Sequence, residues 1–151
     1  MTERTHAPRS PDDVTVDSPF TLPGFFSALG EGRLLGARCT DCEKRLVPPR
    51  TACYACGGRD LVVEEQPRTG EIFSYTEVRV SSPPFADLAP FTVAIVELKS
   101  GARLTGRVDL PYDETEIGTS VRLSIREPSE SEREAALRHE REWPLHVFEL
   151  S

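Results

Sequence analysis

The sequence predicts a mainly β protein with a short N-terminal helix, a cysteine-rich ribbon and then a small barrel of five to six strands. All four cysteines lie between positions 39 and 56, as two Cys-x-x-Cys pairs. After residue 67, short segments of high β propensity alternate with turns, which fits a barrel better than a sandwich. We therefore expect a disordered tail over residues 1–19, a helix and ribbon over 20–66, and the barrel over 67–151.

Composition and charge limit the class of protein. The chain has 151 residues, 38% of them hydrophobic, and a net charge of −7, which suits one ordinary domain or two small ones. Residues 1–19 are polar and lack the apolar run of a secretory signal. The sequence also contains no apolar run of about 18 residues, the length that a membrane span needs. These observations predict a soluble cytoplasmic protein that does not bind membranes.

The first ordered element is predicted over residues 21–30. Pro23 suits the first turn of a helix and Gly30 suits its C-terminal end. So short a helix is not stable alone, so its apolar stripe must pack against something. The stripe could pack on the helix's own domain, on a partner protein or on an apolar ligand. Its residues, at helical spacing, are Phe25, Phe26 and Leu29.

The two Cys-x-x-Cys pairs have the pattern of zinc knuckles, in which backbone N–H groups fold over thiolate sulfurs. Four sulfurs fill a tetrahedral zinc site and leave no open position for a catalytic water. Iron in a rubredoxin-like site uses the same ligands, whereas a reducing cytosol disfavours two local disulfides. A redox Cys-x-x-Cys would need a βαβ pattern, which is missing here. We predict a structural Zn²⁺ site whose ligands are Cys39, Cys42, Cys53 and Cys56.

Three short strands are predicted around the cysteines, at residues 33–38, 46–50 and 61–64. Such a ribbon has almost no core, so metal binding supplies its folding free energy, about 10–16 kcal/mol at neutral pH. Residues 33–59 carry six basic and two acidic side chains, a local charge of +4, so the remaining chain sums to −11. The basic ribbon suits a phosphate-bearing ligand or an acidic partner, although solvated arginines explain the same charge.

The barrel strands follow from alternation and turn signals. Residues 72–80 alternate with period two, which would place Ile72 and Val78 on one face and Tyr75 on the other. The segment 91–98 is nearly continuous apolar, which is typical of a strand covered on both faces. The other strands are expected at residues 103–108, 117–125 and 143–150.

Two further features interrupt the strands. Gly106 lies inside a predicted strand, where it indicates a bulge or a bend of the barrel. Residues 129–141 predict one charged surface helix. Its N-terminal capping box pairs Ser129 with Glu132, or else Ser131 with Glu134.

The order of these motifs is similar to that of a known family. A Phe-Phe helix is followed by Cys-x-x-Cys pairs around Pro-Pro-Arg. The segments Thr-Gly-Glu-Ile-Phe-Ser-Tyr-Thr and Pro-Phe-Thr-Val-Ala-Ile-Val-Glu-Leu-Lys-Ser-Gly-Ala-Arg-Leu-Thr-Gly come next. Over residues 20–125 the chain resembles the acyl-CoA-associated family with an N-terminal rubredoxin-like zinc ribbon and a C-terminal OB-fold. The resemblance implies an OB-fold-like barrel and a zinc ion at the four cysteines.

The resemblance implies an accessory subunit of a thiolase, a MaoC-like hydratase or an aldolase in lipid metabolism. The resemblance implies a co-catalytic subunit in a hetero-oligomer that bridges enzymes and binds or channels acyl-CoA. The contact residues expected for a partner or for acyl-CoA lie in the helix and in the basic ribbon. They are Phe25, Phe26, Leu29, Arg38, Arg45 and Arg50.

We find no catalytic constellation, so we expect no catalytic residue and no activity of the chain alone. None of the three histidines lies in a motif, and His146 is expected to be a half-buried strand residue. The alternative function is single-stranded nucleic-acid binding, because zinc ribbons and OB-folds both serve it. Residues 60–125 carry eleven acidic and six basic side chains, which would repel phosphates, so the sequence argues against this alternative.

Overall fold

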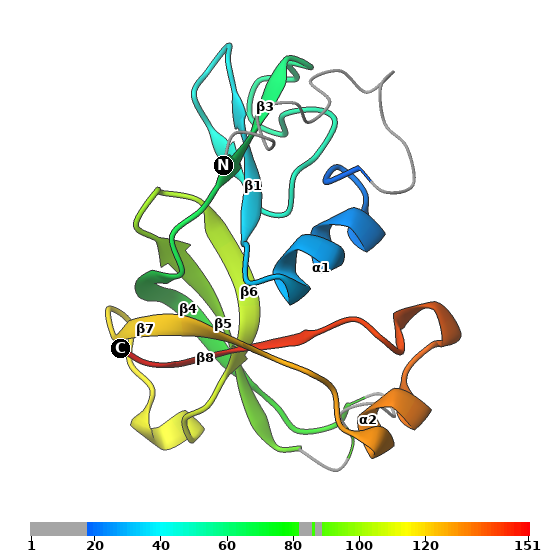
Figure 1. Cartoon of the computed structure of the whole chain (residues 1–151). Coiled ribbons are helices and arrows are strands. Elements are labelled where there is room, and N and C mark those ends of the chain that lie inside the picture. Colours follow the sequence, from blue (N-terminus) through cyan, green and yellow to red (C-terminus); the bar gives the residue numbers. More distant parts are fainter. Residues whose placement is uncertain (1–17, 82–85, 87–88) are drawn as a thin grey trace.

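The structure, a computed structural model, describes residues 18–81, 86 and 89–151. The tail predicted over residues 1–19 therefore lies outside the described residues, apart from its last two. Of these, Ser18 is buried, and its carbonyl accepts a hydrogen bond from the Thr21 N–H at 2.9 Å. Figure 1 shows a three-stranded ribbon above a five-stranded barrel, with one helix beside their junction.

No helix within the described residues is long and apolar enough to cross a membrane.

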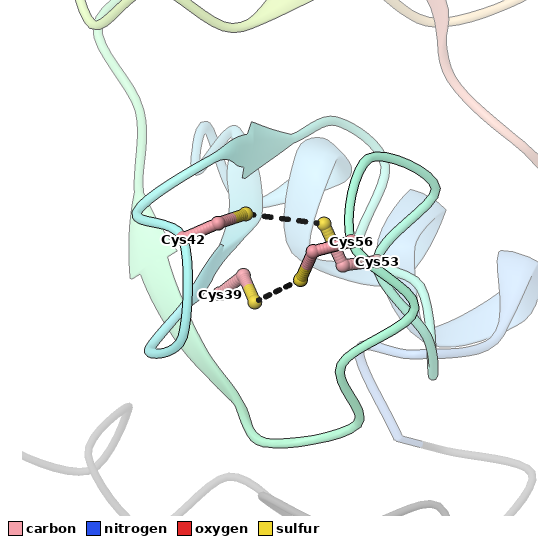
Figure 2. A group of neighbouring side chains, drawn as sticks. All are labelled: Cys39, Cys42, Cys53 and Cys56. Carbon is pink, nitrogen blue, oxygen red and sulfur yellow. Dashed lines mark hydrogen bonds between the residues drawn. The ribbon is translucent and has the colours of Figure 1, made fainter.

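The ribbon forms from strands β1 (Leu35–Cys39), β2 (Arg45–Leu46) and β3 (Leu61–Glu65). Both β2 and β3 pair antiparallel with β1, which lies between them. The strand predicted at residues 46–50 is shorter, because Pro48 and Pro49 cannot donate hydrogen bonds to a neighbour. The four cysteines lie at the end of this ribbon (Figure 2).

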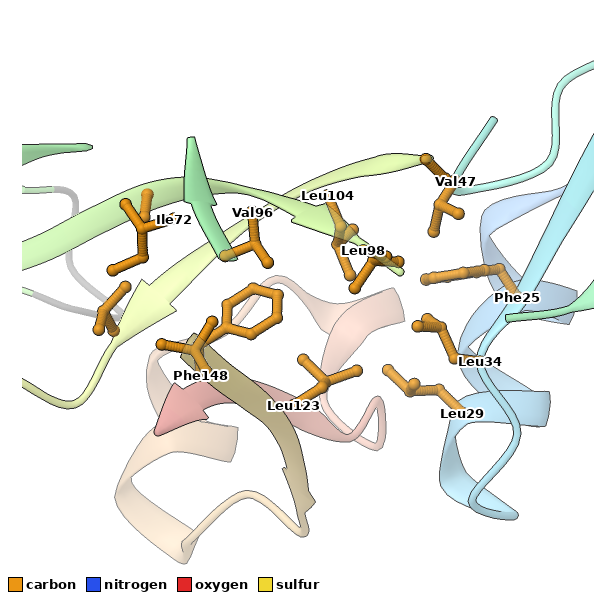
Figure 3. Packing of buried hydrophobic residues seen from close by; sticks show 14 residues of the cluster. Phe25, Leu29, Leu34, Val47, Ile72, Val96, Leu98, Leu104, Leu123 and Phe148 are labelled. Carbon is orange, nitrogen blue, oxygen red and sulfur yellow. The ribbon is translucent and has the colours of Figure 1, made fainter. Parts of the chain in front are cut away.

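Helix α1 (Leu22–Gly30) is capped by the preceding Thr21, whose side-chain oxygen accepts a hydrogen bond from the Gly24 N–H at 3.2 Å. Phe25 and Leu29 are 4% and 1% exposed, and they belong to the same buried cluster as barrel residues. The stripe of α1 thus packs on the chain's own barrel (Figure 3). Leu34 and Val47 of the ribbon join this cluster, so helix, ribbon and barrel share one core.

The barrel has five strands in the closed order β4-β5-β6-β8-β7, an OB-fold-like arrangement. Neighbouring strands are antiparallel except β6 and β8, which are parallel. The last strand closes the barrel, and its Phe148 is fully buried at the centre of the core. The strands are β4 (Thr69–Val78), β5 (Phe91–Leu98), β6 (Arg103–Val108), β7 (Ser120–Arg126) and β8 (Leu145–Leu150).

The strand faces differ in two places from the prediction. The pairing of β4 with β5 shifts between Ile72 and Ser74, a β-bulge that breaks the period-two alternation. Both Ile72 and Tyr75 therefore contact the core, although the alternation had assigned them to opposite faces. Strand β5 is buried on one face only, and Ile95 on its other face is 38% exposed. The prediction that both faces of β5 are covered was wrong.

Gly106 marks no bulge, because β5 and β6 pair in continuous register past it. A Cβ atom at this position would lie 2.8 Å from the Phe148 ring and 3.2 Å from the His146 ring. Gly106 therefore leaves room for the largest side chain of the core. The prediction of a bulge was wrong, and the close approach of the Phe148 ring accounts for the glycine.

The predicted helix over residues 129–141 is shorter in the structure. Helix α2 (Glu130–Ala135) is followed by an extended residue, Ala136, and by the 3₁₀ turn η5 (Arg138–Glu140). A second 3₁₀ turn, η4 (Tyr112–Glu114), precedes β7. The segment has few apolar residues for packing, and a short helix without such packing does not extend.

Glu132 fixes the start of α2. The capping box pairs it with Ser129, whose N–H donates to the Glu132 carboxylate at 2.7 Å. Two guanidinium nitrogens of Arg126 donate to the same carboxylate at 2.9 and 2.7 Å. The hydrogen bonds from Arg126, together with those from Ser129, hold the pKa of Glu132 at about 2.

These contacts predict a stability loss in acid. Because the pKa of Glu132 is lowered by folding, its contribution is present above the ordinary glutamate pKa of about 4.3 and is lost as the pH falls toward 2. We expect Glu132→Gln to lower the free energy of unfolding at pH 7 by less than about 1 kcal/mol, because the ion pair is near solvent. Thermal unfolding at pH 7 and at pH 2 should show this difference shrinking in acid. Glu134→Gln, on the exposed face of α2, is the control. An equal loss for Glu132→Gln at both pH values would contradict the prediction.

Candidate metal centre

Two backbone turns of the same geometry carry the four cysteines. In the first turn, the Cys39 N–H donates to the Lys44 carbonyl at 2.9 Å. In the second turn, the Cys53 N–H donates to the Gly58 carbonyl at 2.8 Å. In both turns the acceptor lies five residues after the donor. The two Cys-x-x-Cys pairs thus form two copies of one knuckle, as the sequence predicted.

Each knuckle contains one residue of left-handed backbone directly after its second cysteine. These residues are Glu43, with φ of 67°, and Gly57, with φ of 78°. Their N–H groups donate to the carbonyls of Cys39 and Cys53 at 2.8 and 2.9 Å, which closes each turn. Gly57 adopts this conformation without strain, whereas Glu43 does not have that freedom. The first knuckle therefore keeps the turn geometry at a cost in backbone conformational energy at Glu43.

The four sulfur atoms lie within 4.8 Å of one another. The Sγ atoms of Cys39 and Cys56 are 3.6 Å apart, as are those of Cys42 and Cys53 (Figure 2). With Zn–S bonds of about 2.3 Å, a tetrahedral site separates its sulfurs by about 3.8 Å. The arrangement therefore fits one zinc ion held by both knuckles. These sulfur pairs join different Cys-x-x-Cys motifs, and all four cysteines are free of disulfide bonds.

Hydrogen bonds and crowding determine how the thiols ionise. The backbone N–H groups of Cys56 and Ala55 lower the pKa of Cys53 to about 7. The Gly58 N–H acts in the same direction on Cys56, but neighbouring thiols and burial outweigh it and raise the pKa of Cys56 to about 12. Four thiolates at this spacing need a cation to balance their charge. When bound, the zinc ion would supply that balance and hold the ribbon closed.

The three contact residues predicted on α1 differ in how far they are buried. Phe25 and Leu29 are buried in the core, so their side chains are not open to a partner or to acyl-CoA in this fold. Their predicted role as contacts does not fit this burial, which explains instead how α1 is attached to the barrel. Phe26 is only partly buried, and its ring stacks on Trp143 with centroids 4.5 Å apart and an interplanar angle of 15°.

The three predicted arginines also differ from one another. Arg38 Nε lies 2.7 Å from one Glu64 carboxylate oxygen, and Arg45 Nε lies 3.3 Å from the other. Glu64 thus links two arginines of the ribbon, and its hydrogen bond to Arg38 raises the pKa of that arginine. Arg50 is exposed and lines a surface pocket of about 410 Å³ beside the start of α1.

His146 lies in β8 with its ring Nε2 3.3 Å from the Thr105 carbonyl oxygen. Burial lowers the pKa of His146, so the ring is neutral at neutral pH. Within the described residues, His146 contacts no carboxylate or thiol that would make it a general base. It is the half-buried strand residue that the sequence predicted.

Sequence reasoning missed one surface feature, a groove of about 400 Å³ between α1 and the segment before β8. Its walls include Leu22 and Phe26 from the start of the chain and Trp143 from the end. The only signal in the sequence was the tryptophan itself, an unusual residue for a charged segment. Its partner Phe26 lies more than 100 positions away, which no local pattern reveals.

Comparisons with known proteins place the two parts of the chain in one family. Residues 26–62 match the family model described as the ChsH2 rubredoxin-like zinc ribbon domain. Residues 63–126 match the model described as the ChsH2 C-terminal OB-fold domain. The zinc ribbon of the first description agrees with the four clustered cysteines.

Individual relatives cover most of the described chain. A DUF35 domain-containing scaffold protein of Methanothermobacter thermautotrophicus is 36% identical over 99 residues, 64% of this chain and 74% of the relative. A probable enoyl-CoA hydratase alpha subunit of Thermomonospora curvata is 36% identical over 100 residues. That match spans 66% of this chain but only 31% of the relative.

A solved structure titled Ltp2-ChsH2(DUF35) aldolase superposes with a TM-score of 0.63 and 30% sequence identity. The superposition covers 84% of this chain and 91% of the other, so it includes ribbon and barrel together. The relatives and both domain models agree on the same architecture. The chain therefore belongs to the DUF35 family, in which a rubredoxin-like zinc ribbon precedes an OB-fold domain.

Proposed function

We propose that this chain is an accessory scaffold subunit of an acyl-CoA-processing enzyme complex, which holds a partner enzyme and helps to bind or channel acyl-CoA. The observation that carries the proposal is the likeness, over 84% of the chain, to a structure titled as an aldolase with a ChsH2 (DUF35) component. Relatives named as scaffold proteins and as a hydratase subunit support it. The partner is an aldolase, a MaoC-like hydratase or a thiolase.

The chemistry of the described residues supports a binding role. The zinc site has four sulfur ligands from the chain, so it holds no position for a substrate or a catalytic water. The metal instead fixes the ribbon, and α1 connects the ribbon to the barrel through their common core. A chain in which ribbon, helix and barrel are joined by one core suits a subunit that holds other proteins.

The pocket at Arg50 is our candidate for the phosphate groups of CoA. It lies at the N-terminal end of α1, beside the helix cap Thr21, and the first turn of α1 has no acidic residue. Helix N-termini carry partial positive charge that favours anions, and the Arg50 guanidinium adds a full charge. Arg38 and Arg45 share Glu64, so we assign them to partner contact with the ribbon rather than to phosphate binding.

Charge reversal at this pocket should weaken the binding of CoA. We expect Arg50→Glu to raise the Kd of the isolated chain for CoA about tenfold, which corresponds to about 1.4 kcal/mol. Isothermal titration calorimetry with CoA measures this change directly. Arg59→Glu is the matched control, because Arg59 is also exposed but does not line the pocket. Equal losses for both variants would show a general charge effect and contradict the assignment to Arg50.

Complex formation tests the proposed function itself. The chain should be co-expressed with the thiolase, hydratase or aldolase encoded beside its gene and examined by size-exclusion chromatography. We expect one peak that contains both proteins and persists at physiological salt. Separate elution from each of these enzymes would overturn the proposal. A salt-dependent shift with single-stranded DNA or RNA would favour the nucleic-acid alternative instead.

A further inference from the structure

The groove between α1 and the C-terminal segment is a second surface that the zinc site does not explain. One wall comes from α1 and the other from the segment that runs from Pro128 to His146. This segment contains α2, and it lies on the same side of the barrel as α1 (Figure 1). It also lies beyond residue 126, where the match to the OB-fold family model ends. The groove is thus built largely by a part of the chain outside both family models.

The lining of the groove is mainly apolar and is ordered by aromatic contacts. Phe26 stacks on Trp143, and it also meets Phe25 edge to face with centroids 5.2 Å apart. Since Phe25 is anchored in the core, this chain of rings fixes the floor of the groove. Leu22 at its rim is 51% exposed, an apolar side chain that the described part of the chain leaves half uncovered. The volume of about 400 Å³ is within the range of about 300–1,000 Å³ for small-molecule sites.

Two of the ionisable side chains in the wall, Glu132 and His146, have hydrogen-bond partners, and the other two are Glu140 and Arg141. Glu132 accepts hydrogen bonds from Arg126 and from the Ser129 N–H. The His146 ring interacts with the Thr105 carbonyl. A polar ligand at Glu132 or His146 would therefore compete with existing hydrogen bonds, whereas an apolar ligand against Phe26, Trp143 and the prolines would exchange water-exposed surface for apolar contact.

The groove also lies next to the pocket at Arg50. Leu22 lines both, with Phe26 and Trp143 on one side and Arg50 on the other. An apolar groove thus lies beside a pocket with a positive charge and a helix N-terminus. An acyl-CoA has the same division, with an uncharged hydrocarbon chain and anionic phosphates.

We propose that this groove binds the hydrocarbon chain of an acyl-CoA, with the chain lying against Phe26 and Trp143. The inference rests on the proposed function and adds to it the position of the acyl group. It concerns the isolated chain, so the binding does not need the partner enzyme. Binding of the hydrocarbon chain forms and breaks no covalent bond.

The single tryptophan of the sequence makes the groove directly observable, because Trp143 is the only indole in the chain. Purified chain should be titrated with decanoyl-CoA while Trp143 emission is recorded, with CoA and sodium decanoate as separate arms. We expect decanoyl-CoA to shift the emission to shorter wavelength in a saturable manner, because the acyl chain displaces water from the ring. Decanoate should cause the same shift with weaker binding, and CoA alone should cause none.

Two variants localise the effect. Ala136→Leu places bulk in the groove, and Leu22→Ser removes an apolar side chain from its rim. We expect each to raise the Kd for decanoyl-CoA at least fivefold. Leu137→Phe is the matched control, since Leu137 is the next residue and is 61% exposed but does not line the groove. Thermal unfolding of each variant checks the fold, and because Leu22 is half exposed its replacement should not disturb it.

The outcomes separate this inference from the proposed function. An emission that decanoyl-CoA leaves unchanged, or a Kd that neither groove variant alters, would overturn the acyl site even if the chain co-elutes with an enzyme. A Trp143 shift caused by the partner enzyme alone, and lost in Ala136→Leu, would show that the groove docks a protein and would equally overturn it. Saturable decanoyl-CoA binding without any co-eluting enzyme would support the groove and contradict the proposed function.

Discussion

Replacing Cys39 by serine is expected to abolish stoichiometric zinc binding and to unfold the ribbon. Cys39 is fully buried at the end of β1, and a neutral serine hydroxyl does not replace a thiolate as a ligand. The ribbon's own buried cluster cannot compensate, because two of its five members are metal ligands. These five residues are Ala37, Cys39, Leu46, Cys53 and Leu61.

The magnitude follows from the coupling of metal binding to folding. Zinc contributes about 10–16 kcal/mol in small structural sites, more than the whole stability of many domains. Elemental analysis should find one zinc ion per wild-type chain and far less in the variant. Hydrogen exchange should show lost protection in β1 and β3, while the barrel strands keep most of theirs.

Two controls make this result specific. Tyr54→Ser alters an exposed residue inside the second Cys-x-x-Cys motif without removing a ligand, so zinc and exchange protection should both be retained. Iron in place of zinc in the wild-type protein would identify the rubredoxin alternative. A Cys39→Ser protein with one zinc ion and normal protection of β1 would contradict the closed four-cysteine site.

The parts of this molecule that the sequence predicts well are those determined by local spacing. The two knuckles depend on residues within six positions of each other, and both cysteine pairs are where the pattern indicated. The capping box at Ser129 and Glu132 is another local motif, and it is present. The end of α2 was missed because helix length depends on packing, and residues 129–141 offer few apolar side chains for it.

What the sequence could not provide depends on distant contacts. The apolar stripe of α1 looked equally suitable for a partner and for the chain's own barrel. Only the folded barrel shows that Phe25 and Leu29 are needed in its core. Arg38 and Glu64, which form an ion pair, lie 26 positions apart in the sequence. Phe26 and Trp143, whose rings stack, lie more than 100 positions apart. The bulge after Ile72 has no signature in its alternating residues.

Replacing Phe148 by alanine is expected to lower the free energy of unfolding of the barrel by about 3–5 kcal/mol, the usual cost of emptying a buried phenylalanine site. Phe148 is fully buried and belongs to the last strand, which pairs with both β6 and β7. Chemical denaturation of the zinc-loaded chain would measure the change. Leu150→Ala is the control on the same strand, because Leu150 is 61% exposed and its loss should stay within about 0.5 kcal/mol.

Gly106 provides a sharper test of the same contact. Its hypothetical Cβ lies 2.8 and 3.1 Å from two carbons of the Phe148 ring, which close packing prevents from moving away. Gly106→Ala alone should therefore destabilise the barrel by about 1–3 kcal/mol. In the Phe148→Ala background the same change should cost much less, because the ring that it would strike is absent. The resulting coupling energy should favour the double variant by about 1 kcal/mol or more. Strictly additive losses would show that Gly106 is required for its backbone and not for the space that Phe148 occupies.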